Sequence, residues 1–293
     1  MTSPAADPAE WLLRVGAAAG LEASLPDVVP TDIELAAELL EARHGPPGAR
    51  FAEVAFGFGT DRAEVFEAKN ASLRLSVEIS LMWNRAVYLR ELSALGDLIA
   101  DLRPGRILDL GCEQGIVTCF IASSLPEAEV IGVDRSPAAV ARARELAAAT
   151  GTGHVRFEAG DFLSEPLGGA DGSPTAGSGG GPSGVSGPAD LVVCSRSMIG
   201  EALPGVGENG WSRDSAASAA ARLAGMIGET GVLFLLERGS PESLAEWFDL
   251  LAACGLVARQ VAGFACDEPS NPGQEFTIAV ARGAPDAPVQ PVS

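Results

Sequence analysis

A short glycine turn and a carboxylate nineteen residues beyond it are the residues of this chain best suited to hold a ligand. The turn occupies residues 111–115 and follows the apolar run 107–110, and Asp134 ends a second apolar run over 130–133. A buried strand, a glycine turn, a helix start and an acidic strand end, in this order, are typical of a parallel sheet that binds an adenosine-containing cofactor across its edge. The carboxylate of Asp134 would accept hydrogen bonds from two ribose hydroxyls.

The residues of the turn favour one class of cofactor over another. Dinucleotide-binding turns have the spacing G-x-G-x-x-G, which brings a pyrophosphate to a helix N-terminus. This turn lacks that spacing and carries Glu113 where a pyrophosphate would lie, and like charges placed together cost free energy. We expect the polar end of the ligand to approach the backbone at Gly111 and Gly115, where a Cβ would obstruct it. A cofactor with one nucleoside, a sulfonium and a zwitterionic amino-acid end fits better.

The turn resembles the first motif of class I S-adenosylmethionine-dependent methyltransferases, D/E-x-G-x-G-x-G. The chain matches it at Asp109, Gly111 and Gly115 and departs from it at Glu113, where the family usually has glycine. The resemblance implies S-adenosyl-L-methionine as the cofactor. The cofactor-binding candidates are Asp109, Gly111, Glu113, Gly115, Asp134, Arg135, Asp161, Phe162 and Ser195.

The resemblance also implies individual roles for some of these candidates. Asp134 would bind the ribose and Asp161 the adenine amino group, while Phe162 and Arg135 would flank the adenine ring. Asp161 has the alternative of a turn or N-cap residue after a strand. Asp109 has the alternative of holding the glycine turn through backbone hydrogen bonds.

Strands and helices alternate regularly from residue 106 onwards. We expect strands over 107–110, 130–133, 154–158, 191–194, 232–236, 256–261 and 276–280. Helices are expected over 116–125, 137–149, 215–227 and 243–254. The last two strands have no crossover helix between them, so one of them must run antiparallel. The sequence thus predicts an α/β, Rossmann-like fold: a seven-stranded, mostly parallel sheet with a terminal antiparallel strand.

The chain is expected to divide into a helical, loop-rich N-terminal cap over residues 1–75 and a methyltransferase domain over 76–283. In the cap, a helix is expected over 31–42 and the alternation at 54–58 weakly indicates a strand. Residues 71–102 are expected to form two helices or one bent helix. The Gly/Ser/Pro-rich insertion 168–187 and the tail 284–293 are expected to be disordered.

Composition excludes several classes of function. The 293 residues carry 20 basic and 39 acidic side chains, a net charge of −19 that disfavours a nucleic-acid substrate. The five cysteines show no C-x-x-C pairing or accompanying histidine cluster, so we predict neither a metal site nor disulfides. No signal peptide or apolar run of about 20 residues is present, which favours a cytoplasmic protein without a membrane partner. The sequence leaves the oligomeric state open, a homodimer included.

Few residues are candidates for a general acid or base. Where the methyl acceptor is a hydroxyl or an ammonium, a base must remove a proton. Glu201, after the fourth strand, and Glu237, at the end of the fifth, are the catalytic candidates, since both follow strand ends; pairing with a neighbouring arginine is the alternative for Glu237. His154 is expected to be structural, and His44 is expected to be a capping or solvent-exposed residue at a helix end.

Other residues bear on the acceptor. The segment 194–199 does not match the N/D-P-P-Y/F motif of amino-methyltransferases that act on nucleobases or glutamine. An apolar acceptor pocket would draw on Trp83, Tyr88, Met198 and Trp211. We therefore expect methyl transfer from S-adenosylmethionine to an O or N atom of a small-molecule acceptor. The alternatives are a non-methyl reaction of the same cofactor, a non-catalytic cofactor-binding module and a protein substrate.

Overall fold

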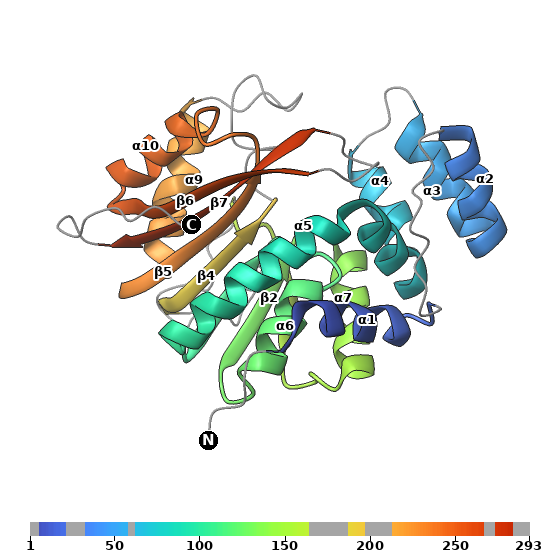
Figure 1. Ribbon diagram of the computed structural model, residues 1–293, viewed down its shortest axis with the longest axis horizontal. Coiled ribbons are helices and arrows are strands. Elements are labelled where there is room, and N and C mark those ends of the chain that lie inside the picture. Colours follow the sequence, from blue (N-terminus) through green and yellow to red (C-terminus); the bar gives the residue numbers. More distant parts are fainter. Residues whose placement is uncertain are drawn as a thin grey trace, which may run out of the picture.

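The computed structural model describes residues 6–21, 33–57, 62–163, 187–196, 213–266 and 273–283. At its centre lies one seven-stranded sheet with the order β3-β2-β1-β4-β5-β7-β6 (Figure 1). The strands are β1 (Arg106–Leu110), β2 (Glu129–Asp134), β3 (Arg156–Ala159), β4 (Ala189–Ser195), β5 (Ile227–Arg238), β6 (Leu256–Cys266) and β7 (Gln274–Gly283). β1 to β5 pair in parallel, and β7 lies antiparallel between β5 and β6. The predicted fold class is confirmed, including the antiparallel strand near the end of the chain.

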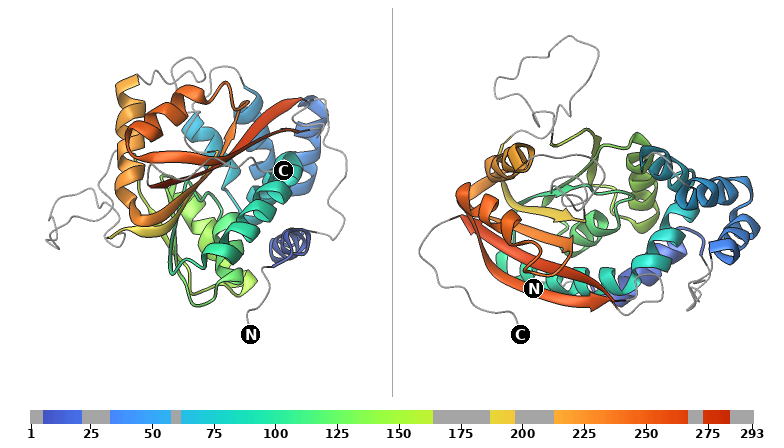
Figure 2. Two further views of the ribbon diagram at one scale, coloured as in Figure 1. Left: turned by 60° about the vertical axis from the view of Figure 1, so that its left-hand side comes forward. Right: turned by 90° about the horizontal axis from the view of Figure 1, so that it is seen from above.

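Helices cover both faces of the sheet because successive strand residues point to opposite sides. Val193 packs with α1 (Pro8–Ala18), α5 (Leu73–Leu102), α6 (Ile116–Ser124) and α7 (Pro137–Thr150). Its neighbour Val192 packs with α9 (Arg213–Met226) and α10 (Ala245–Ala253) on the other face. Figure 2 shows the two helical layers from two further directions. The expected α/β alternation therefore produces two separate hydrophobic cores.

The Phe157 ring of β3 requires a glycine beside it in β2. A Cβ added to Gly132 of β2 would stand 2.7 Å from the Phe157 ring and 3.0 Å from the Cys112 sulfur. Carbon atoms in contact normally lie at about 3.5–4.0 Å. Gly132 therefore gives the Phe157 ring its space beside the central strands.

In the described part of the expected cap, α2 (Ile33–His44), α3 (Pro46–Phe56) and α4 (Arg62–Lys69) follow α1, which packs on the sheet instead. The weak strand expectation for residues 54–58 was wrong, because residues 54–56 belong to α3. Pro46 occupies the first turn of α3, where the missing N–H costs nothing and the fixed φ favours a helix. α2 and α3 lie on the side of the molecule away from α9 and α10 (Figure 1).

α5 is the bent helix that the sequence predicted. Asn84 departs from helical geometry, with φ −138° and ψ 20°. Before the bend, Leu75 and Ile79 pack with the cap helices. After it, Leu92 and Leu95 pack on the sheet. A single bent helix thus joins the cap to the sheet, and the domain division at residue 75 stays a prediction.

A buried ion pair fixes the cap to the first half of α5. The Glu78 side chain is fully buried and contacts Arg43, while His44 Nε2 lies 2.9 Å from Glu78 Oε2. Burial raises the pKa of Glu78, but the two basic partners more than offset this and hold the pKa below its ordinary value. His44 lies at the end of α2, as expected, but its side chain is 3% exposed, so the solvent-exposed alternative was wrong.

Some expectations lie partly or wholly outside the described residues. These are the tail 284–293 and residues 168–186 of the insertion. All five cysteines are free thiols, as predicted. Within the described ranges there is no helix long and apolar enough to cross a membrane, and no group of three potential metal ligands. The cellular location and a homodimer stay predictions.

Candidate functional site

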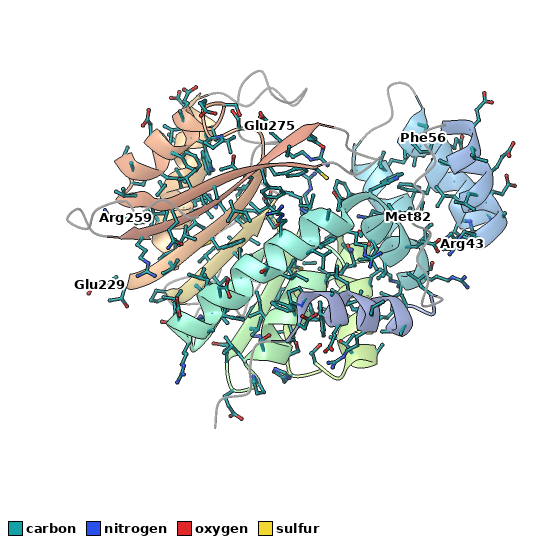
Figure 3. All side chains as sticks on the ribbon, in the orientation of Figure 1. Arg43, Phe56, Met82, Glu229, Arg259 and Glu275 are labelled. Carbon is teal, nitrogen blue, oxygen red and sulfur yellow. The ribbon has the colours of Figure 1, made fainter. Side chains whose placement is uncertain are left out.

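The candidate site lies at the edge of the sheet where the parallel strands end. β1, β2 and β4 run in the same direction, so the residues that follow them gather at one edge. Figure 3 gives the orientation: Glu229, near the start of β5, and Glu275, in antiparallel β7, lie at opposite edges of the sheet. Glu275 marks the edge at which β5 and the other parallel strands end.

The glycine turn between β1 and α6 is held by backbone hydrogen bonds. The N–H groups of Gly111 and Cys112 donate to the carbonyl of Val133 in β2, at 2.8 and 3.0 Å. The N–H of Gly115 donates to the carbonyl of Cys112 at 2.8 Å. Gly111 has a φ of +76°, a conformation that favours glycine. The turn is therefore a fixed structure joined to the end of β2.

Gly115 lies against the core of the protein. A Cβ at this position would lie 3.0 Å from both Ala143 and the Phe157 ring, and the residue has a φ of +81°. Packing and backbone conformation therefore both require glycine here. The approach of a ligand to its backbone stays a prediction.

Asp134 is anchored where the sequence placed it, at the end of β2. Its Oδ2 accepts a hydrogen bond from the Glu113 N–H at 2.9 Å, and its Oδ1 accepts one from the Ser136 N–H at 2.8 Å. Burial raises the pKa of Asp134, partly offset by these two donors. An ionised carboxylate has about four acceptor positions, so two remain for hydroxyl groups. This arrangement fits the recognition of a ribose.

Asp109 holds the start of α6. Its Oδ2 accepts the Thr118 hydroxyl at 2.6 Å, and the residue is 1% exposed. Burial raises the pKa of Asp109 to about 7; the Thr118 hydrogen bond and Arg196 lower it, and the negative charges of Glu91 and Asp134 raise it. That it also holds the glycine turn through backbone hydrogen bonds stays a prediction. Its role in the described structure is to join β1 to α6.

We expect Asp109 to make the stability of the protein fall between about pH 4 and pH 7. Its folded pKa, about 7, lies above the ordinary pKa of an aspartate, so the folded state binds the proton more tightly. Stability is therefore lost as the pH rises through this window. Urea unfolding at pH 5 and pH 8 checks this, with Asp109→Asn as the comparison. The variant should lose less stability than the wild type between the two pH values. An equal loss would contradict the assignment.

The three residues expected to contact the adenine lie in different environments. Asp161 Oδ1 accepts the Leu163 N–H at 2.9 Å, the hydrogen bond of the turn alternative. Phe162 is 7% exposed and packs in the core beside α9 and α10 rather than standing open at the edge. Arg135 is exposed. Contact of these three residues with an adenine ring stays a prediction.

A buried charged cluster at the end of β4 was missed by the sequence reasoning. The Arg196 guanidinium lies over the Tyr88 ring, 4.4 Å from its centroid, and 3.5 Å from the fully buried carboxylate of Glu91. Arg196 Nε also lies 3.4 Å from the Ser195 hydroxyl. Burial raises the pKa of Tyr88 to about 12 and raises the pKa of Glu91, while the positive charge of Arg196 lowers both. The sequence offered one signal for two of these residues. Tyr88 and Glu91 are polar and lie three residues apart on a predicted helix that is otherwise largely apolar.

Lys69 is the second residue that the sequence did not single out. It is the last residue of α4 in the cap and forms an ion pair with Glu113 of the glycine turn. The side chains are 12% and 22% exposed, respectively. No signal in the sequence could have joined them, because they are 44 residues apart on elements that meet only in the folded chain.

The catalytic and acceptor candidates are only partly described. Glu237 is 3% exposed at the end of β5, opposite Thr277 of β7. Trp83 packs on Phe51 and Phe56 in the cap, with ring centroids 5.7 and 6.2 Å away. The remaining candidates, Glu201, Met198 and Trp211, lie outside the described residues.

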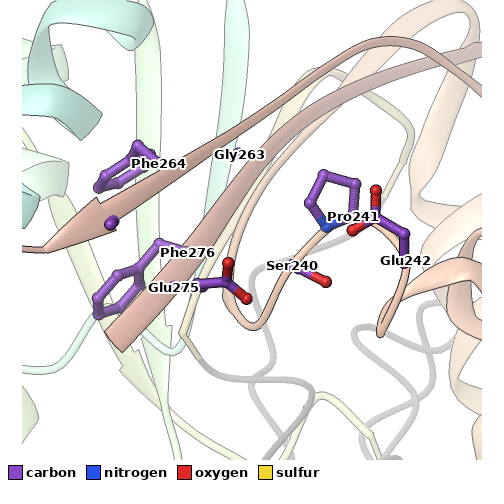
Figure 4. A pocket seen from close by; sticks show the side chains of 8 residues that line it. Ser240, Pro241, Glu242, Gly263, Phe264, Glu275 and Phe276 are labelled. Atoms are coloured by element: carbon purple, nitrogen blue, oxygen red, sulfur yellow. The ribbon is translucent and has the colours of Figure 1, made fainter. Parts of the chain in front are cut away.

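A pocket of about 240 Å³ lies beside this edge (Figure 4). The turn after β5, with Ser240 to Glu242, faces Gly263 and Phe264 of β6 and Glu275 and Phe276 of β7. The volume is below the roughly 300–1,000 Å³ of typical small-molecule pockets. No residue of the glycine turn lines it. It is therefore not the site for a nucleoside cofactor.

Part of the chain is similar in sequence to known methyltransferases. Residues 103–198 match the family model described as "Methyltransferase domain". The trans-aconitate 2-methyltransferase of Streptomyces coelicolor is 41% identical over 94 residues, 28% of this chain and 30% of that protein. The ribosomal RNA large subunit methyltransferase G of Streptomyces avermitilis is 49% identical over 59 residues, 20% of this chain and 16% of that protein. The chain thus spans less than a third of the length of these curated relatives.

Solved structures provide similar but distant matches. The N-methyltransferase NodS of Bradyrhizobium japonicum, in complex with S-adenosyl-L-homocysteine, is 14% identical with a TM-score of 0.48; the match covers 77% of this chain and all of that one. An O-methyltransferase-type protein of Nostoc punctiforme is also 14% identical with a TM-score of 0.48, covering 94% of this chain and 72% of that one.

Proposed function

We propose that this chain, whose residues 103–198 match a methyltransferase domain, is a class I S-adenosylmethionine-dependent methyltransferase that transfers a methyl group to an O or N atom of a small-molecule acceptor. The observation that supports this most is the joining of Asp134 to the glycine turn through the Glu113 N–H at 2.9 Å. The bond holds a carboxylate with spare acceptor positions beside the turn that matches the family motif.

The residues present fit the cofactor. Asp134 would accept hydrogen bonds from the ribose hydroxyls, and the turn from Gly111 to Gly115 would lie beside the amino-acid end. Asp161, Phe162 and Arg135 would surround the adenine, with Ser195 at the end of β4. When bound, S-adenosylmethionine supplies a methyl group on a sulfonium leaving group, so the protein mainly orients the acceptor and excludes water.

The acceptor is proposed to be a small molecule rather than a nucleic acid. The net charge of −19 would repel a phosphate backbone. Several relatives are named trans-aconitate methyltransferases, which supports a small acid as one class of acceptor. The ribosomal RNA methyltransferase among the relatives is the observation that favours RNA as the second candidate.

Glu201 or Glu237 is proposed to orient or deprotonate the acceptor, because Glu237 lies at the end of β5 and Glu201 comes after β4 in the sequence. Glutamine at either position keeps the size of the side chain and removes the base. The residue that acts should show a lower kcat when replaced by glutamine, with cofactor affinity retained. Unchanged turnover in both variants would remove this role.

The activity is tested with S-adenosylmethionine labelled in its methyl group. The full chain is incubated separately with a pool of small carboxylic acids and amines and with unmodified ribosomal RNA. We expect the label in a small-molecule product. Label in the RNA would overturn the small-molecule acceptor, and label that stays on the cofactor remnant would support cyclisation or aminocarboxypropyl transfer. Binding without turnover on any acceptor would favour a non-catalytic module.

A further inference from the structure

Glu113 holds a backbone conformation that its residue type disfavours. Of the residues that the structure describes, only Arg103, Glu113 and Arg196 combine a side chain with a positive φ. Arg103 ends α5, whereas the other two lie at the candidate site. Glu113 has a φ of +50° where the resembled motif usually has glycine, the residue that adopts this conformation without strain. Strained residues of this kind concentrate at ligand-binding sites.

The Glu113 carboxylate is joined to a positive charge from the cap. Lys69, at the end of α4, contributes the ammonium. The two side chains are neither fully buried nor free in solvent, at 12% and 22% exposure. Removing one partner of a largely buried ion pair is costly because the other charge is left unpaired. A ligand that offers an opposite charge to each partner avoids this cost, because neither charge is left without a partner.

The neighbouring ion pair is built differently. Arg196 contacts Glu91, whose carboxylate is fully buried, and stacks on Tyr88. Separating that pair would leave a charge in the protein interior, which is costly. Lys69 and Glu113 are thus an ion pair of this site that a ligand could engage from solvent.

We propose that Lys69 and Glu113 together recognise a zwitterionic amino-acid end of the ligand, with its carboxylate at Lys69 and its ammonium at Glu113. This inference rests on the proposed function, in which that ligand is S-adenosylmethionine. The Glu113 N–H donates a hydrogen bond to Asp134, the residue proposed to bind the ribose. The same turn would therefore connect the ribose-binding residue to the residue that binds the ammonium. The cap would contribute to cofactor selectivity through Lys69.

The experiment compares two ligands that share the nucleoside and the thioether sulfur. S-adenosylhomocysteine carries the amino-acid end, and 5′-methylthioadenosine lacks it. Calorimetric titration of the full chain should give a wild-type Kd for S-adenosylhomocysteine about 100-fold below that for methylthioadenosine. Lys69→Met and Glu113→Gly should each reduce this preference about tenfold, mainly by weakening S-adenosylhomocysteine.

Two variants separate recognition from a structural role. Glycine at position 113 relieves the positive φ, so Glu113→Gly should keep or raise the melting temperature while the preference falls. Arg50→Met removes an exposed ion pair with Glu64 between α3 and α4 and should leave the preference unchanged. If Lys69→Met and Glu113→Gly retain the wild-type preference, the inference is overturned and the cofactor assignment stands. If the wild type binds neither ligand, the proposed function fails and the inference with it.

Discussion

Arg196→Met is expected to lower the free energy of unfolding by about 4 kcal/mol, because it leaves a buried carboxylate without its counter-charge. Glu91 is fully buried, and the Arg196 guanidinium lies 3.5 Å from its Oε2. Methionine keeps much of the length of the side chain and removes only the charged group. Urea unfolding at pH 8 measures the loss.

The pH dependence and a double variant check the cause of this loss. The positive charge of Arg196 lowers a Glu91 pKa that burial raises, so in Arg196→Met this pKa should rise further. The folded state then binds the Glu91 proton more tightly, and the loss should shrink as the pH falls towards the ordinary pKa of a glutamate. Glu91→Leu combined with Arg196→Met should recover most of the stability. A loss that is the same at pH 5 and pH 8 would contradict the explanation.

Trp247→Ala is expected to destabilise the fold by about 4 kcal/mol. Trp247 is fully buried in α10 and packs in the core between α9, α10 and the sheet. The substitution leaves a cavity that the two helices can fill only by moving. Measuring the urea midpoint and slope gives the change in unfolding free energy.

Trp247→Phe is the matched control. Within the described part of the chain, the indole Nε1 of Trp247 has no hydrogen-bond partner. Phenylalanine keeps an aromatic ring and removes this buried donor, so its cost should be well below that of alanine. Equal losses for the two variants would show that the indole N–H has a partner essential to the fold.

The sequence predicted the sheet and its strand directions because those depend on local patterns. Apolar runs closed by a turn specify strands, and the missing crossover helix after β6 required an antiparallel partner. The cap was predicted less well. Residues 54–56 alternate as a strand does, but Pro46 begins a helix and Phe51 packs against Trp83. Packing against α5 thus overrode the local pattern.

The part of the candidate cofactor site that belongs to a sequence motif could be predicted. Asp134 and the glycine turn lie together as expected. Lys69, Glu91 and Arg196 could not be assigned, because each acts through a partner that is distant in sequence. The packing of Gly115 against Phe157 could not be predicted for the same reason, since Phe157 belongs to another strand. The hydrophobic periodicity of the sequence does not indicate which helices and strands come into contact in the folded chain.

The measurement that tests the central claim most directly is the titration of S-adenosylhomocysteine into the wild type and Asp134→Ala, with melting curves to confirm that both are folded. We expect saturable binding to the wild type and an affinity lower by about 100-fold or more in Asp134→Ala, because two hydrogen bonds to a carboxylate are lost. No binding to the folded wild type, or equal affinity in the two proteins, would contradict the assignment of this edge of the sheet as the cofactor site.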